Sequence, residues 1–305
     1  MANIALVTDN AAHAAYTNTK ALLESFGHVV TGYTSAAVTN ANLMAADLIC
    51  ACRTTNNTAY NDKIAAAHAA GKPVLCGSDG SVTAGTVYTN SVAARCGLVL
   101  SQVATQPMGS AYAHAPSPIY DAAGVIVPTS VQFYPTGGEA TWFCDSVPIA
   151  SGSIAPGAQS IMQDLASSPT KDVIVCALTG GGKLGGGTFA APIIFSGFFY
   201  GAPGYTTLGG QLIRRMVEWL LSGGGGSFKF TGTVKDSAGA FIARKVRVFR
   251  RDTGGLIGET TSNATTGVYD IRVLTGGFLA TVVCYDADGG TKNALVKDKV
   301  APVGV

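Results

Sequence analysis

The chain has 305 residues, of which 47% are hydrophobic and only 12% are charged, and its formal net charge is +2. The charged fraction is about half of the roughly 25% usual for soluble domains, and this depletion is typical of surfaces that neighbouring molecules cover. Residues 1–222 carry 9 basic and 11 acidic side chains and residues 227–305 carry 11 and 7, so neither part has the basic excess of a nucleic-acid-binding protein.

The beginning of the chain alternates between two hydrophobic patterns. Short continuous apolar runs are typical of buried strands, whereas apolar residues at helical spacing followed by glycine are typical of helices with a left-handed cap. The elements expected here are a strand at residues 3–8, a helix at 16–26, a strand at 28–33, a short helix or turn at 39–44, a strand at 45–50, a helix at 61–70 and a strand at 74–76. This alternation predicts an α/β fold with a flavodoxin-like, doubly wound and mostly parallel sheet.

The middle of the chain is less regular. A helix is expected at residues 82–97, and six prolines between 98 and 150 favour loops and short edge strands. Further strands are expected at 160–165, 172–178 and 190–199. The last two would form a hairpin whose flexible tip is the glycine-rich segment 180–187, and residues 208–221 form the clearest amphipathic helix. The longest apolar run, 190–200, is too short to cross a bilayer, so we expect no membrane insertion.

A Gly/Ser stretch precedes a C-terminal part with a different hydrophobic period. Residues 222–227, SGGGGS, have the composition of a flexible linker. Beyond them apolar residues recur with period two, in strands expected at 228–234, 245–249, 258–261, 269–273 and 278–284. The sequence therefore predicts an α/β domain at 1–221, a linker at 222–227 and a small all-β sandwich at 228–305.

The strand at 74–76 runs directly into the sharp turn Gly77-Ser78-Asp79-Gly80. In open α/β sheets, functional sites lie at the carboxyl ends of strands, and a nucleophile can stand on such a turn. Cys76 holds this position and is the candidate nucleophile. The chain has no CxxC spacing and no Cys/His cluster, so we expect neither a metal nor a cofactor.

Residues 1–221 resemble the class I glutamine amidotransferase-like superfamily, especially its ThuA-like branch. The matching pieces are IALVTD, AADLIC, AAGKPVLCGSDG, HAPSPIYDAAG and GGQLIRRMVEWLL. The C-terminal part resembles carboxypeptidase-regulatory or transthyretin-like sandwiches of Ig-like type, through the segment from FTGTVKDSAG to GVYDIRVL. With its ending NALVKDKVAP, it is similar to modules appended to bacteriophage virion proteins.

An active amidotransferase of this superfamily has a cysteine at the sharp turn after such a strand, here called the elbow. It pairs this cysteine with a His and a Glu that lie two residues apart on a later strand end. The thiolate needs a base, and the base needs an orienting carboxylate. This chain departs from that pattern, because Val74 stands where a small residue is usual and no His-x-Glu follows. The last histidine is His114, in a proline-rich segment with no carboxylate nearer in sequence than Asp121. The resemblance therefore implies a degenerate elbow, and we expect Cys76 not to be catalytic.

Three other motifs are each better explained as a structural feature than as a phosphate-, nucleic-acid- or calcium-binding site. The glycine-rich segment lacks phosphate-loop spacing, because Ala177 holds the first glycine position and Leu184 follows the lysine. In the basic segment 244–251, charged and apolar side chains alternate, as expected for an ordinary strand with one face exposed to solvent. Asp286 and Asp288 begin a calcium-like loop that lacks its closing glutamate.

These observations predict a non-enzymatic structural protein of a bacteriophage virion, located in the tail or as a capsid decoration and assembled in the host cytoplasm. Its expected partners are other virion proteins and further copies of itself, since repeated weak contacts add up in a multi-copy assembly. The C-terminal segment 294–305 could make such a contact by strand addition. Two alternatives stay open, which are a cysteine-dependent hydrolase or amidotransferase-like enzyme and a module that binds a host receptor or glycan.

Overall fold

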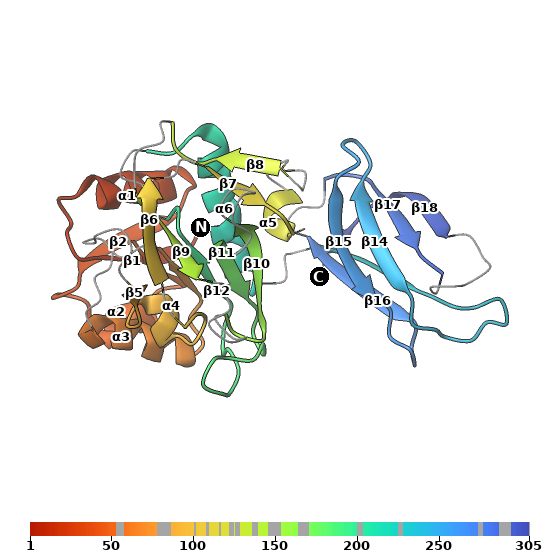
Figure 1. The fold of residues 1–305 in the computed structure, drawn as a ribbon, viewed down its shortest axis with the longest axis horizontal. Coiled ribbons are helices and arrows are strands. Elements are labelled where there is room, and N and C mark those ends of the chain that lie inside the picture. The colour runs from red at the N-terminus through yellow and green to blue at the C-terminus, as the bar shows by residue number, and fades with distance from the viewer. Residues whose placement is uncertain are drawn as a thin grey trace. The chain divides into compact units, whose positions relative to one another are not determined.

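The structure is a computed structural model (Figure 1). It describes residues 1–52, 58–77, 87–100, 102–107, 110–115, 117–121, 125, 129–135, 140–145, 154–163, 171–199, 204–224, 228–273, 277–286 and 294–304. The chain divides into two compact units. The first, here called the α/β unit, comprises Met1–Ala115 and Pro128–Gly224, and the second, here called the β unit, comprises Pro116–Val127 and Gly225–Val305.

The α/β unit is built on one large mixed sheet. Its first five strands run parallel in the order β2-β1-β3-β4-β12, in keeping with the βαβ alternation of the sequence. These strands are β2 (Val29–Thr34), β1 (Asn3–Thr8), β3 (Leu48–Ala51), β4 (Val74–Cys76) and β12 (Ile193–Ser196). β3, β4 and β12 are buried along their whole length, which is why their sequences are continuous apolar runs rather than alternating ones.

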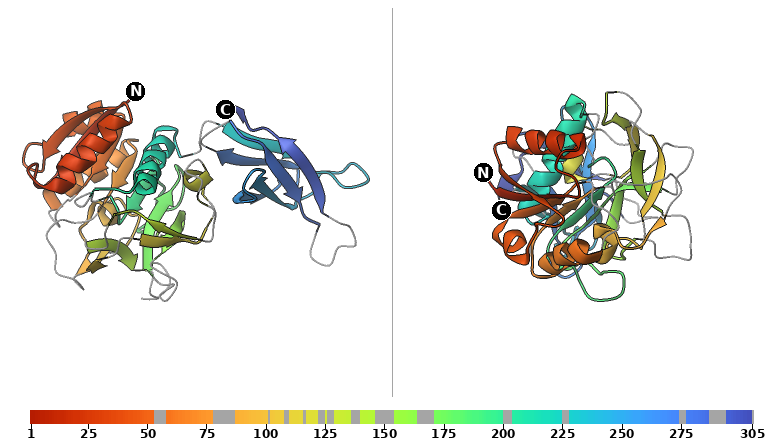
Figure 2. Two further views of the ribbon diagram at one scale, coloured as in Figure 1. Left: turned by 90° about the horizontal axis from the view of Figure 1, so that it is seen from above. Right: turned by 90° about the vertical axis from the view of Figure 1, so that its left-hand side faces the viewer.

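Helices cover both faces of the parallel strands (Figure 2). On one face lie α1 (Ala14–Ser25) and α6 (Thr207–Leu221). On the other lie α2 (Asn40–Ala45), α3 (Thr58–Ala69) and α4 (Val92–Arg95). Gly27 and Gly71 follow α1 and α3 with φ of +84° and +95°, so both helices end in the left-handed conformation that their glycines predicted.

The helix expected at residues 82–97 is wrong in extent. α4 covers only Val92–Arg95, and a short strand, β5 (Val87–Tyr88), precedes it. The side chain of Ser91 accepts a hydrogen bond from the backbone N–H of Ala94 at 3.3 Å and thereby caps the helix start. Residues 82–86 lie outside the described part of the chain.

Beyond β12 the sheet continues with antiparallel strands. They are β11 (Lys171–Ala177), β10 (Ala158–Gln163), β7 (Ser110–Ala113) and β8 (Thr129–Gln132), with β9 (Ala140–Asp145), β6 (Gln102–Pro107) and β5 beside this path. β11 and β12 form the predicted hairpin, but its glycine-rich connection is not a free tip. The backbone N–H of Leu184 donates to the carbonyl of Gly97, and that of Gly157 donates to the carbonyl of Gly182, both at 3.0 Å. A Cβ on Gly157 would lie 2.2 Å from the nitrogen of Gly182, so glycine is needed where these two loops pass.

The β unit contains two antiparallel sheets, in the orders β16-β13-β19 and β15-β14-β17-β18. Their strands are β13 (Phe228–Thr233), β14 (Lys245–Arg250), β15 (Leu256–Thr261), β16 (Val268–Val273), β17 (Ala280–Cys284), β18 (Leu295–Val300) and β19 (Val303–Gly304). Phe230 and Ile271 of one sheet and Val248 and Val282 of the other belong to a single buried cluster. β18 and β19, which sequence periodicity did not predict as strands, pair with β17 and β13.

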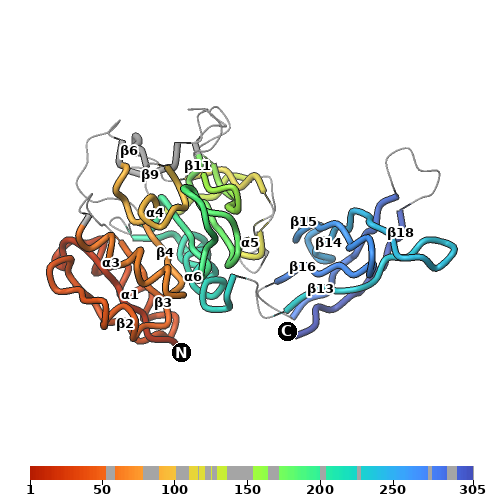
Figure 3. The backbone as a smooth tube through the Cα atoms, turned by 90° about the horizontal axis from the view of Figure 1, so that it is seen from below, coloured from red at the N-terminus to blue at the C-terminus, as the bar shows by residue number. Residues whose placement is uncertain are grey.

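The β unit also takes in residues 116–127, which the sequence analysis placed within the domain at 1–221. The short helix α5 (Pro118–Asp121) lies against β15 and β16 (Figure 3), and its Ile119 and Tyr120 are buried. At the other boundary the β unit begins at Gly225, inside the linker expected at 222–227. The last residues of that linker, 225–227, lie outside the described part of the chain.

Candidate functional site

The candidate nucleophile stands at the carboxyl edge of the parallel strands, as the sequence predicted. Cys76 is the last residue of β4, paired with Ala51 of β3 on one side and with Phe195 of β12 on the other. The backbone N–H of the next residue, Gly77, donates to the carbonyl of Ala51 at 2.8 Å. The rest of the predicted turn, residues 78–80, lies outside the described part of the chain.

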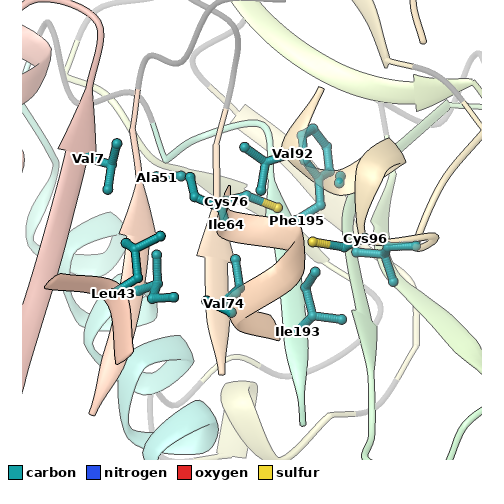
Figure 4. Packing of buried hydrophobic residues seen from close by; sticks show 14 of the residues in the cluster. Val7, Leu43, Ala51, Ile64, Val74, Cys76, Val92, Cys96, Ile193 and Phe195 are labelled. Carbon is teal, nitrogen blue, oxygen red and sulfur yellow. The ribbon is translucent and has the colours of Figure 1, made fainter. Parts of the chain in front are cut away.

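The Cys76 side chain points into the hydrophobic core rather than toward a cleft. It has no exposed surface and packs in a cluster with Val92 and Phe195, while the sulfur atoms of Cys76 and Cys96 point toward one another between β4 and α4 (Figure 4). Its Sγ donates a hydrogen bond to the carbonyl oxygen of Ile194 at 3.4 Å. A reagent or substrate could reach this sulfur only if the core opened.

Burial also keeps the Cys76 thiol in its protonated form. Desolvation raises the pKa of the Cys76 thiol well above its ordinary value, and the neighbouring thiols of Cys96 and Cys50 raise it further. Among the described residues, no imidazole and no carboxylate acts on this pKa. A cysteine nucleophile needs the opposite environment, with a cation or base that favours the ionised form.

The turn after Cys76 is closed by backbone packing. A Cβ on Gly77 would lie 2.1 Å from the carbonyl oxygen of Phe199, in the turn that follows β12. Glycine is therefore required at this position for close approach of two backbone segments. The glycine of this elbow thus serves the packing of the sheet edge.

No histidine is among the groups that act on the pKa of Cys76, and two of the histidines have local roles. His13 caps α1 by accepting the backbone N–H of Ala15 at 3.1 Å. His68 is fully buried in α3, where its Nδ1 contacts the carbonyl of Lys72 at 3.0 Å and its Nε2 has no hydrogen-bond partner. Neither histidine occupies the position of a base for the elbow.

His114 has neighbours that sequence spacing did not reveal. It follows β7, and its Nε2 lies 3.1 Å from the hydroxyl oxygen of Ser160 on β10. The buried carboxylate of Asp172 on β11 acts on its pKa, although Asp121 is nearer in sequence. Strand pairing thus brings His114 beside Ser160, which lies 46 positions later in the chain and which sequence spacing did not reveal.

The glycine-rich segment is not a phosphate loop, because a strand and not a helix follows it. The ammonium group of Lys183, in its middle, lies over the ring of Phe189 at 5.5 Å from the centroid. No group of three His, Cys, Asp or Glu side chains suited to a metal occurs within the described ranges. Asp286 pairs with Arg244 at 3.5 Å, and Asp288 lies outside the described part of the chain.

The basic strand of the β unit carries its own counter-ions. The ion pairs are Arg247 with Glu259 at 2.7 Å, Arg250 with Asp252 at 2.9 Å and Arg251 with Asp298 at 3.1 Å. Guanidinium groups that are engaged in this way form a mixed surface rather than a phosphate-binding stripe. The part of the chain that the structure describes holds no helix whose length and apolarity suit it to crossing a bilayer.

A pocket of about 710 Å³ lies at the opposite, amino-terminal edge of the parallel strands. Its charged and titratable lining comes from His28, Asp47 and Lys72. Asp47 accepts the backbone N–H of Asn3 at 2.8 Å, and Lys72 donates to the carbonyl of Ala46 at 2.8 Å. Asp47 and Lys72 are thus used within the protein, whereas Nδ1 of His28 has no hydrogen-bond partner.

No protein-family model matches the chain, and no curated protein matches it. One similar solved structure is a ThuA-like protein from Bacteroides uniformis, with 12% identity over 72% of this chain and 90% of that chain, at a TM-score of 0.45. Another is an exo-β-1,4-mannosidase from Opitutaceae bacterium strain TAV5, with 10% identity over 63% of this chain and 30% of that chain, at a TM-score of 0.35. At these TM-scores neither likeness carries an argument about this chain.

Proposed function

We propose that this chain is a structural protein of a bacteriophage virion and that Cys76 is a core residue rather than a catalytic one. The observation that carries the second part is the complete burial of the Cys76 thiol, with its pKa raised by desolvation and by neighbouring thiols. An α/β unit with such an elbow is a rigid body without the chemistry of an amidotransferase. In this proposal the unit serves the assembly through the surfaces that it presents.

The virion assignment draws support from composition and from the resemblance of the C-terminal module. Only 12% of the residues are charged, as expected where neighbouring subunits cover the surface. In the same proposal, the strand order β2-β1-β3-β4-β12 corresponds to a flavodoxin-like, ThuA-related sheet. The two sheets of the β unit with their shared core correspond to an Ig-like or transthyretin-like sandwich.

Contacts with other virion proteins would use side chains more than open strand edges. The segment 294–305 that we considered for strand addition already pairs within the β unit, through β18 and β19. β18 is an edge strand, but two residues, Asp298 and Lys299, stand opposite the single Thr281, and Lys299 has a φ of +57°. A bulge and flanking lysines discourage the addition of a further strand.

The experiment is a search for the chain in purified particles of the phage that encodes it. Peptide mass spectrometry of particles banded on a density gradient should find it at a fixed ratio to the major capsid or tail protein. Cryo-electron microscopy should then place density of both units in many symmetric copies. Particles that lack the protein altogether would refute the virion assignment.

A second comparison separates assembly from host binding. A phage that carries a chain truncated after residue 226 should still adsorb to its host if the β unit serves only incorporation. Loss of adsorption with normal incorporation would instead favour the host-receptor or glycan alternative.

A further inference from the structure

The antiparallel half of the α/β unit holds a polar group unlike the elbow at Cys76. Ser160 lies within β10 and His114 directly follows the neighbouring strand β7, with Oγ and Nε2 3.1 Å apart, and both residues are partly exposed. The backbone N–H of His114 donates to the carbonyl of Ile161 at 3.3 Å, which fixes the histidine beside β10. Nucleophile and base are therefore within hydrogen-bond reach on a surface that a ligand can approach.

The pairing of β10 with β11 becomes irregular directly after Ser160. Ser160 pairs with Val175 and Met162 pairs with Ile174, so β10 has one residue more than β11 at this point. Such bulges redirect a side chain out of strict alternation and occur beside functional sites. A regular strand would not carry this extra residue between Ser160 and Met162.

The third group is a buried acid. Asp172 is 2% exposed, and the amide of Gln163 donates to its Oδ1 at 3.5 Å. Its negative charge raises the pKa of His114, while burial of the imidazole lowers that pKa by more, so the histidine is neutral near pH 7. The negative charge of Asp172 favours the protonated imidazole, so it would stabilise the charge that His114 gains when it takes up a proton.

We propose that Ser160 is a nucleophile that accepts an acyl group from a carboxylic ester, with His114 as its general base and Asp172 as a positioning residue. Ser160 Oγ forms a bond to the carbonyl carbon of the ester while its proton passes to Nε2 of His114. The carbon–oxygen bond to the alcohol then breaks, and the alcohol leaves with that proton. The products are acyl-Ser160 and a free alcohol, and the step needs no oxidant, reductant or metal.

This inference is independent of the proposed structural role. It concerns β7, β10 and β11, whereas the argument about Cys76 concerns β4 and α4. A virion protein can carry a reactive serine, and a chain absent from virions can carry one too. Failure of either proposal therefore leaves the other standing.

The test is covalent labelling of the full chain with a fluorophosphonate probe, which reacts with activated serines. Peptide mapping should find the adduct on Ser160 in the folded protein, and para-nitrophenyl acetate should give a burst of about one equivalent of para-nitrophenolate. His114→Gln should slow labelling about 100-fold or more, because general-base catalysis contributes a factor of that size. Ser25→Ala is the matched control, since the Ser25 hydroxyl is exposed and donates only to the carbonyl of Leu22 at 2.6 Å.

A pH profile separates the roles of His114 and Asp172. The labelling rate should rise with pH to a plateau whose midpoint lies below the ordinary histidine value of about 6.5. Asp172→Asn removes the charge that raises the pKa of His114, so the midpoint should move to lower pH, which a purely structural effect would not produce. If His114→Gln does not fold, the wild-type adduct and its pH midpoint decide the matter. Absence of an adduct on Ser160, or labelling that stays as fast in a folded His114→Gln variant, overturns the proposal.

Discussion

The thiol of Cys76 should be unreactive as long as the protein stays folded. A related magnitude comes from its neighbour Cys96, whose pKa burial raises to about 12. At pH 8 that thiol is ionised to about one part in 10⁴, against about a quarter for an ordinary cysteine of pKa near 8.5. Alkylation is therefore slower by roughly 10³-fold even before the reagent is excluded. Cys76 shares this environment, since burial and the Cys96 thiol itself raise its pKa.

The assay is a timed pulse of iodoacetamide at pH 8, followed by peptide mapping, in native buffer and across a urea series. Cys284 is partly exposed and serves as the internal reference for the native protein. Cys76, Cys50 and Cys96 are buried and should become modified only at urea concentrations that unfold the α/β unit. Modification of Cys76 in native buffer at a rate near that of Cys284 would refute the argument and revive a cysteine-dependent enzyme.

Three further predictions concern stability. Gly209→Ala should lower the free energy of unfolding in urea by about 2 kcal/mol, because the new Cβ would lie 2.5 Å from the carbonyl oxygen of Phe133. Gly210→Ala is the matched control: its Cβ would meet nothing nearer than 3.4 Å, so it should stabilise α6 by about 0.5–1 kcal/mol. Equal effects of the two substitutions would contradict the packing described. Burial lowers the pKa of His68, so as the pH falls the unfolded chain takes up a proton at this histidine before the folded chain does. The free energy of unfolding should therefore decrease below about pH 6.5, by up to about 1.4 kcal/mol per pH unit more than in His68→Gln. Parallel pH profiles for the two proteins would rule this out. Lys299→Gly should raise the thermal midpoint by relieving about 1 kcal/mol of left-handed strain at φ +57°, and an unchanged or lower midpoint would count against that strain.

The parts of the fold that sequence could predict are those encoded by local pattern. A few consecutive apolar residues are enough to predict the buried strand β1, and Gly71 alone marks the end of the helix before it. The amphipathic stripe of α6 does the same, and Leu212, Ile213, Met216, Val217 and Leu220 are all buried. Cys76 could be placed at the end of a strand for the same reason, because turn-forming residues directly follow the apolar run of β4 in the sequence.

The parts that sequence could not predict depend on partners far along the chain. The short helix α5 buries Ile119 and Tyr120 against strands more than 100 residues later, and nothing in its own proline-rich sequence indicates that surface. β18 is exposed along almost its whole length, so its sequence lacks the alternation by which strands are recognised. The contact of His114 with Ser160 likewise needs the order of strands in the sheet, which no spacing rule supplies.

The two strands that carry candidate nucleophiles, β4 and β10, differ in one physical respect, which is the exposure of the nucleophile to water. At β4 the same burial that packs Cys76 between Val92 and Phe195 raises its pKa, so the contribution of the sulfur to core stability and its loss of nucleophilicity have one cause. At β10 Ser160 is partly exposed, and a hydroxyl needs only a neighbouring base rather than prior ionisation to attack. Burial of Cys76 therefore does not bear on the reactivity proposed for Ser160, and alkylation of Cys76 and phosphonylation of Ser160 measure the two properties separately.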